Sequence, residues 1–478
     1  MDEARRIYLG QSKAGEDSFI LSSAFNKHGV VTGATGTGKT VTLQILAEKL
    51  SRLGVSVVAA DVKGDLSGIA EPGREHPKIA ERVEKLHIND FSFEANPVCL
   101  WDVFGERGLP LRTTISEVGP LLLSNILQLN DNQEGLLHLV FRIADAEGLL
   151  LLDLKDLREA LRYVSEERDK FQDEYGLISP QSVGAIQRRL VVLEEVGGDK
   201  FFGEPGLSLS DLLQCDFSGR GVIHLLDSTK LINEPRLFSS VLLWILSELF
   251  EQLPEVGERD LPRLVFFFDE AHLLFETASD PLLEKIEQLV RLIRSRGVGV
   301  FFVSQHPLDI PEKVSRQLGT RILHALRSTT PREAELLERA AKTFPSADGF
   351  DFKHEVTTLG VGEAIVTSLN EDAAPTEPLT VYLCPPRSRI GPCDGALRSE
   401  LLSRNPLSSK YTDSVDRESA FEILKKRREE LSQSAPKKGS SSSRQGPLEA
   451  FFKSIVRSVG YQLGNAISRG ILGSIKKR

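Results

Sequence analysis

The amino-acid sequence has little that would suit secretion or a membrane. It holds four cysteines in 478 residues, and no two of them have the CxxC spacing of common zinc sites; the four are Cys99, Cys215, Cys384 and Cys393. No run of about 18 apolar residues is present, so we expect no membrane-spanning helix. Charged residues at positions 2, 3, 5 and 6 stand where a signal peptide would be apolar. We therefore expect a cytoplasmic protein with reduced thiols.

Acidic residues are scarce at the C-terminal end of the sequence. Residues 386–478 hold 19 Lys or Arg and 9 Asp or Glu, a net charge of +10, whereas the whole chain has −9 and the first 385 residues therefore −19. A basic tail on an acidic body suggests that the tail meets a polyanion or an acidic surface, and a tail that only aids solubility fits equally well. The acidic body argues against a broad nucleic-acid-binding face but not against a basic lining inside a pore.

Apolar β-branched runs alternate with helical patterns over most of the chain. Val30 and Val31 end a strand, a helix is expected at 39–52, and 55–61 is a second buried strand, which together make one βαβ unit. The pattern continues with strands expected at 222–226, 264–268, 298–304, 321–326, 363–368 and 379–384, and helices at 237–250, 281–296 and 331–342. Such alternation predicts an α/β fold with a mostly parallel sheet covered on both faces.

Composition divides the sequence into five expected segments. Residues 1–110 form the first part of the α/β core, and the leucine-rich residues 111–200, with helical spacing, form a helical insertion. The core resumes at 201–385, and 386–446 is a basic extension ending in a serine-rich linker. Residues 447–478 have apolar side chains at helical spacing, which predicts an amphipathic C-terminal helix.

A glycine-rich phosphate-binding loop lies between the first strand and the first helix. It fits the pattern G-x-x-x-x-G-K-[ST] and consists of Gly33, Ala34, Thr35, Gly36, Thr37, Gly38, Lys39 and Thr40. Glycines let the backbone N–H groups turn inward toward phosphate oxygens, and the following helix adds its positive N-terminus. We expect Lys39 to reach the β- and γ-phosphates of ATP, Thr40 to bind Mg²⁺, and the nucleotide-binding stretch to extend to Val41.

An acidic pair ends the apolar strand 264–268. We expect Asp269 to hold Mg²⁺ and Glu270 to act as general base on the attacking water. A strand that merely ends in solvated acids is the alternative, and the phosphate loop upstream disfavours it. Gln305, at the end of strand 298–304, is expected to sense the γ-phosphate or position water, although it could simply begin a loop before Pro307.

Charge that spreads over a transferring phosphoryl group calls for an arginine, often from a neighbouring subunit. Arg291, Arg294 and Arg296 end the helix before the Gln305 strand, and we select Arg294 as the catalytic finger. A surface salt bridge is the competing interpretation for each of the three.

These blocks together resemble the HerA/FtsK superfamily of ring-forming DNA-pumping ATPases, and within it the bacterial HerA-like (YjgR-type) group. The stretches that carry the resemblance are 28–44, 61–68, 133–135, 148–157, 267–273, 297–307, 415–420 and 447–473. The resemblance implies a RecA-like P-loop NTPase core, a homohexameric ring and ATP-driven movement on DNA. It also implies an arginine finger three residues before Gly297, at Arg294, and a sensor at Gln305.

Two other functions stay open at this level. The protein could be an ATP-dependent switch or assembly factor whose C-terminal tail docks a protein partner, or an ATPase whose residues 448–475 lie on a membrane surface. The roles of Asp61, Lys63 and Asp65 are also open, since Lys63 could touch phosphate or the three could form a local charge cluster.

Overall fold

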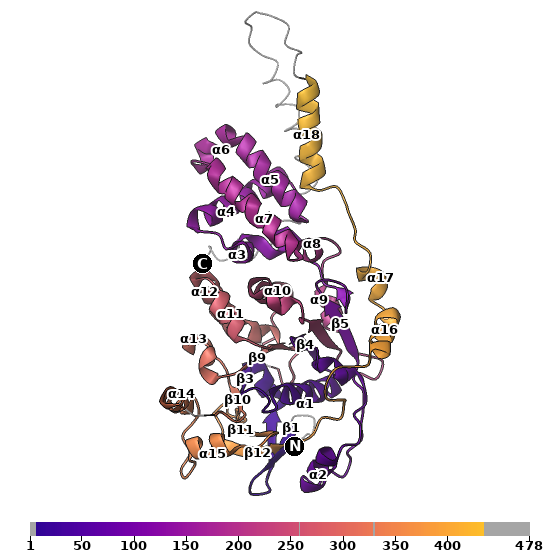
Figure 1. The fold of residues 1–478 in the computed structure, drawn as a ribbon, viewed down its shortest axis with the longest axis vertical. Helices are drawn as coiled ribbons and strands as arrows, with labels where there is room; N and C mark the ends of the chain where they lie inside the picture. Colours follow the sequence, from indigo (N-terminus) through magenta and orange to yellow (C-terminus); the bar gives the residue numbers. More distant parts are fainter. Residues whose placement is uncertain (1–5, 258, 328–329, 435–478) are drawn as a thin grey trace, which may run out of the picture. The chain divides into compact units, whose positions relative to one another are not determined.

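The computed structural model describes residues 6–257, 259–327 and 330–434 (Figure 1). The described residues form two compact units: the first comprises 6–111 and 207–413, and the second 112–206 and 414–434. None of the helices in this described part is long and apolar enough to cross a membrane. The predicted linker beyond residue 434 and the predicted helix at 447–478 lie outside the described residues.

One sheet forms the centre of the first unit. Its described strands follow the order β2-β1-β12-β11-β10-β3-β9-β8-β4-β7-β5-β6. Their bounds are β1 Arg6–Ser12, β2 Asp17–Leu21, β3 Gly29–Thr32, β4 Ser56–Asp61, β5 Val98–Asp102, β6 Leu109–Pro110, β7 Ile223–Asp227, β8 Leu264–Phe268, β9 Val298–Ser304, β10 Thr320–Leu323, β11 Glu363–Thr367 and β12 Leu379–Leu383. The strands from β10 through β3, β9, β8, β4, β7 and β5 to β6 are parallel, whereas β11, β12, β1 and β2 add antiparallel pairs. The predicted mostly parallel α/β sheet is confirmed.

Helices cover both faces of this sheet. The helix α1 (Lys39–Arg52) packs on β3 and β4 through Leu43, Leu46 and Leu50, whose spacing places them on one side of the helix. On the other face, Phe275 of α11 (His272–Thr277) packs against Phe302 with ring centroids 5.4 Å apart. Further helices of this unit are α2 Pro77–Lys85, α9 Leu209–Leu212, α10 Pro235–Gln252, α12 Asp280–Ile293, α13 Glu312–Ser315, α14 Pro331–Ala341, α15 Phe352–Thr358, α16 Gly395–Arg404 and α17 Ser408–Tyr411.

The second unit is helical where the structure describes it, as the leucine periodicity predicted. Its helices are α3 Ile115–Leu127, α4 Asp131–Glu147, α5 Leu154–Glu166, α6 Arg168–Tyr175, α7 Pro180–Glu195, α8 Gly198–Phe201 and α18 Ala420–Ser434. The last of these packs on α5 although more than 250 residues separate them in the chain. Residues 386–413, which the sequence grouped with the linker, belong to the first unit and contain α16 and α17.

Candidate active site

The glycine loop follows β3 directly and depends on backbone angles that suit glycine. Gly33, Gly36 and Gly38 have φ values of 149°, 79° and 118°, which side chains other than hydrogen rarely allow. A Cβ atom on Gly33 would lie 2.5 Å from Cβ of His324, so this position is also closed sterically. The glycines of this loop are therefore required both by its backbone angles and, at Gly33, by the packing against His324.

Lys39 and the first turn of α1 supply positive charge to this loop. The Lys39 ammonium donates to the carbonyls of Gly33 (2.7 Å) and Ala34 (3.2 Å), which keeps it inside the loop. Burial lowers the pKa of Lys39, while the nearby Glu270 carboxylate opposes that shift. Gly38 precedes α1 as its N-cap residue and provides no side-chain cap, so the first N–H groups of the helix stay available to an anion.

A buried histidine supports the loop from behind. His324 follows β10, and its Nε2 lies 2.8 Å from the hydroxyl of Thr42 on α1. Burial lowers the pKa of His324 to about 4, so the ring is neutral at physiological pH. The Thr37 hydroxyl donates to the Ala34 carbonyl (2.7 Å) and closes the loop on itself.

The acidic pair lies at the carboxyl end of β8, two strands away from β3. The N–H of Glu270 donates to the Asp269 carboxylate (2.9 Å), and Glu270 has a φ of 48°, in the left-handed region. A non-glycine residue in that region stores strain, which is frequent at functional sites. Burial, with the neighbouring Glu270 carboxylate, raises the pKa of Asp269 to about 7. A bound divalent cation would favour the ionised form.

Donors from three segments surround the Glu270 carboxylate. Gln305 Nε2 donates to Glu270 Oε2 at 3.5 Å, His272 Nδ1 lies 3.4 Å from the same oxygen, and Lys63 Nζ lies 4.0 Å from Oε1. The contacts are long, so the carboxylate is oriented without being locked. The sequence left the role of Lys63 open, and the structure places it beside the expected general base.

The loop that carries Gln305 is held on both sides. The Ser304 hydroxyl and the His306 N–H donate to Asp309 Oδ2, at 2.5 Å and 2.9 Å. Since β9 lies between β3 and β8, Gln305 emerges between the phosphate loop and the acidic pair. A fixed backbone there aims the amide at the space between them.

Asp61 and Asp65, two acids whose roles the sequence left open, lie near the carboxyl edge of the sheet that carries Glu270. Asp61 ends β4, the other neighbour of β8, and is 2 % exposed. Burial raises the pKa of Asp61 to about 6, and the charges of Asp65 and Asp227 add to that shift. Burial also raises the pKa of Asp65, and Lys63 opposes it. The three residues 61, 63 and 65 thus form a charge cluster that touches the site through Lys63.

The donor set suits a magnesium ion bound mainly by substrate. The Thr40 hydroxyl makes no hydrogen bond to the described residues, and the Asp269 carboxylate accepts only its own neighbour's N–H among them. No group of three or more His, Cys, Asp or Glu side chains in the described residues could form a complete protein cage. One hydroxyl and one carboxylate, completed by phosphate oxygens and water, is the pattern Mg²⁺ takes in nucleotide sites.

Arg294 lies away from the phosphate loop and the acidic pair. It follows α12 and precedes β9, so it sits at the amino end of the strand whose carboxyl end carries Gln305. Its side chain is exposed and forms no ion pair or hydrogen bond with the described residues. Arg296, in contrast, is 3.5 Å from Glu255 and packs over the Phe250 ring. Arg294 is therefore free to act on another molecule but not on its own phosphate loop.

The structure thus brings together Lys39, Asp269, Glu270 and Gln305 at one edge of the sheet and leaves Arg294 at the other. Sequence reasoning missed the support from His324 and Thr42. These are single polar residues inside apolar elements, and no short motif marks them.

The phosphate loop, the acidic pair and the parallel sheet define the class of the protein, a P-loop ATPase with a RecA-like fold. The family model "Helicase HerA-like C-terminal" matches residues 6–446, and the chain belongs to that family.

Relatives agree with this assignment. The curated "DNA double-strand break repair helicase HerA" of Saccharolobus solfataricus is 22 % identical over 362 residues, covering 72 % of this chain. The match spans 62 % of that relative's length. Among solved structures, VirB4 of Thermoanaerobacter pseudethanolicus is similar with a TM-score of 0.52 at 16 % identity, covering 80 % of this chain and 97 % of that one. The plasmid coupling protein TrwB in complex with ADP and Mg²⁺ reaches 0.54 at 14 % identity, covering 80 % and 89 %.

Proposed function

We propose that this protein hydrolyses ATP as a Mg²⁺-dependent cytoplasmic motor, and that it forms a homohexameric ring that moves DNA. The observation that carries the proposal is the division of the catalytic groups between two edges of one sheet. Lys39, Glu270 and Gln305 stand at the carboxyl edge, while Arg294 stands free at the amino edge. A ring in which each subunit offers Arg294 to the next would complete every site.

Each residue has a defined task in hydrolysis. Lys39 binds the β- and γ-phosphate oxygens and offsets their charge. Glu270 accepts a proton from the attacking water, and Gln305 orients that water and Glu270 together. The ion held by Thr40 and Asp269, when bound, supplies positive charge to the phosphates. Arg294 of the neighbouring copy stabilises the charge that spreads over the γ-phosphoryl group.

Support for DNA as the molecule that the motor moves comes from its relatives. The HerA relative is named as a DNA repair helicase and TrwB as a plasmid coupling protein. A protein partner bound through the C-terminal tail is compatible with the same motor.

The test measures phosphate release with and without single- and double-stranded DNA at low salt, beside a Lys39→Ala control. The proposal expects hydrolysis that Lys39→Ala abolishes, that DNA stimulates, and whose DNA response weakens steeply with salt. Hydrolysis that DNA leaves unchanged at low salt would contradict the DNA motor and favour the protein switch. A monomeric mass in the presence of ATP would contradict the ring.

A further inference from the structure

The turn after β4 presents one exposed side chain beside the acidic pair. Within residues 61–71, Lys63 is exposed, whereas the others are buried or partly buried. The turn has a fixed shape, because Gly64 has a φ of 76° and a Cβ atom there would lie 3.2 Å from Cγ2 of Thr229. The Ser67 hydroxyl closes the turn by donating to the Gly64 carbonyl (3.1 Å). Lys63 is therefore carried by a backbone with little freedom to move.

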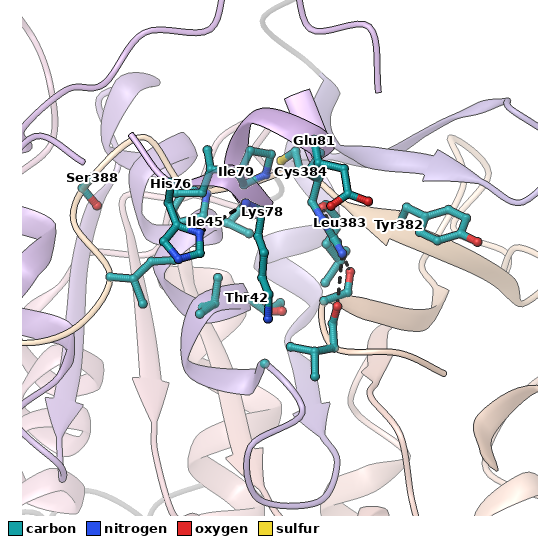
Figure 2. A pocket seen from close by; sticks show the side chains of 18 of the residues that line it. Thr42, Ile45, His76, Lys78, Ile79, Glu81, Tyr382, Leu383, Cys384 and Ser388 are labelled. Carbon is teal, nitrogen blue, oxygen red and sulfur yellow. Dashed lines mark hydrogen bonds between the residues drawn. The ribbon is translucent and has the colours of Figure 1, made fainter. Parts of the chain in front are cut away.

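A segment from late in the chain fastens this turn. It runs on from Ser388, which lines the cavity beside α1 that Figure 2 shows. Arg389 Nη1 donates to both carboxylate oxygens of Glu71, at 3.0 and 2.8 Å, and the N–H of Cys393 donates to the Ser67 hydroxyl (3.1 Å). These contacts join residues more than 300 positions apart in the chain. The tertiary structure therefore anchors the turn in place.

The ammonium of Lys63 lies close to the expected general base. Strand β4 pairs with β8, so the turn after β4 adjoins the residues that follow β8. Lys63 Nζ lies 4.0 Å from Glu270 Oε1, and the two side chains are 49 % and 13 % exposed, respectively. The charge of Lys63 also opposes the rise that burial causes in the pKa of Asp269. One cation thus acts on both members of the acidic pair.

The partners of Glu270 are divided between its two carboxylate oxygens. Gln305 and His272 face Oε2, at 3.5 and 3.4 Å, whereas Lys63 faces Oε1. Among the residues that the structure describes, no other donor reaches Oε1. Without Lys63 the carboxylate would be held at one oxygen and could rotate about its Cγ–Cδ bond. A general base needs a set direction, because its oxygen must stay within hydrogen-bond reach of the attacking water.

We propose that Lys63 is a positioning residue for ATP hydrolysis, which holds the Glu270 carboxylate at Oε1 in the orientation that accepts a proton from the attacking water. This inference rests on the proposed ATP hydrolysis. Lys63 then contributes to the rate of the chemical step. A residue that bound the phosphates would contribute to the affinity for ATP instead, so the two roles predict different measurements.

The test measures ATP affinity and the single-turnover rate of hydrolysis on full-length protein with Mg²⁺. Lys63→Met keeps the length of the side chain and removes its charge. We expect the rate to fall about thirtyfold while ATP affinity stays within about twofold of wild type, and Lys63→Arg to regain most of the rate. The matched control is Lys230→Met, which removes a cation of similar exposure from the turn after β7, where it pairs with Glu106. This control should hydrolyse ATP as the wild type does.

Two results would overturn the positioning role. One is a wild-type rate in Lys63→Met, which would make its contact with Glu270 an ordinary surface ion pair. The other is a loss of ATP affinity that matches the loss of rate, which is the result expected of a phosphate contact.

A double variant tests whether Lys63 acts through Glu270. Glu270→Asp shortens the side chain by one methylene and withdraws the carboxylate from the ammonium. In that background we expect Lys63→Met to lower the remaining rate by less than about twofold, because the interaction is already lost. The same loss in both backgrounds would contradict the proposal. Wild-type protein that binds ATP without hydrolysing it would contradict the proposed function as well, whereas an active wild type with an unaffected Lys63→Met variant contradicts this inference alone.

Discussion

Gly33 is the residue at which backbone and packing demands coincide. Its φ of 149° and the 2.5 Å approach to His324 Cβ both oppose a side chain. We expect Gly33→Ala to weaken ATP binding about a hundredfold or more and to lower the melting temperature, because the loop must move off its support. The control is Gly15→Ala, which has a φ of 83° but open space around it, in the β1–β2 turn. Titration with a fluorescent ADP analogue measures both, and equal affinities would contradict this account.

His28 makes the stability of the folded state depend on pH in the acidic range. Its Nδ1 accepts from the Val300 N–H (3.0 Å), so Nε2 carries the proton and donates to the Val290 carbonyl (2.7 Å). Burial lowers the pKa of His28 to about 4. The unfolded chain binds this proton near pH 6.5 and the folded chain does not. Stability from His28 is therefore complete above about pH 6.5 and is lost as the pH falls toward 4.

His28→Asn tests that response. Asparagine does not titrate, and the backbone strain of φ 59° and ψ 171° at this position is present in both proteins at every pH. We expect the wild type to be more stable at pH 7.5, and its advantage to shrink by up to about 3 kcal/mol by pH 4. Urea unfolding at a series of pH values measures the difference, in which the other buried histidines cancel. A difference that does not change with pH would refute the assignment.

At the scale of elements, α18 belongs to the second unit because the chain comes back there near residue 414 and α18 packs on α5. The buried Asp156 carboxylate accepts from the N–H groups of Leu152 (2.9 Å), Asp153 (3.1 Å) and Phe421 (2.9 Å) and from the Ser419 hydroxyl (2.5 Å). One carboxylate thus caps α5 and holds the start of α18. Ion pairs such as Arg427 with Glu147 lie around it.

Asp156→Asn removes an acceptor oxygen from this arrangement and leaves buried N–H groups without partners. We expect the second unit to lose about 2–4 kcal/mol and trypsin to cut faster between 414 and 434. Asp169→Asn on α6, with a side chain 92 % exposed, is the control. Timed proteolysis with mass spectrometry gives the comparison. Identical cleavage rates in the two variants would show that Asp156 does not hold α18.

The features that could be predicted from the sequence are those specified by residues close together in the chain, and features that depend on contacts between distant residues were missed. The phosphate loop, α1 and β8 are each specified within a few residues, and the structure places them as expected. Helix α2, in contrast, has no fully buried residue, and its Arg82 donates to the carbonyl of Gly362, 280 residues away in the chain. No local pattern encodes such a contact. Strand β1 was missed for the same reason, because it joins the sheet by pairing with β12, about 370 residues later in the chain, and β2 is added only as its hairpin partner.

At the scale of the whole molecule, Arg294 is exposed and makes no ion pair or hydrogen bond with any residue that the structure describes. We expect Arg294→Ala to lower the ATP turnover rate by about a thousandfold while ATP affinity stays within about threefold. Lys313→Ala, which removes an exposed cation from the first unit, serves as control, since within the described part of the chain its ammonium pairs only with Glu287, at 3.5 Å. Single-turnover hydrolysis beside ATP titration separates the two effects. Loss of binding together with turnover would refute the finger role.

The central claim is that a complete site needs two copies of the chain, and mixing two inactive variants tests it most directly. Glu270→Gln lacks the general base but still offers Arg294, whereas Arg294→Ala keeps its own base and lacks the finger. Phosphate release is measured for each variant alone and after the two are combined at equal amounts and allowed to exchange. Random assembly should restore up to about a quarter of the wild-type rate, because about one contact in four pairs an intact base with an intact finger. A mixture as inactive as its components, under conditions where exchange is demonstrated and the wild type hydrolyses ATP, would contradict the claim.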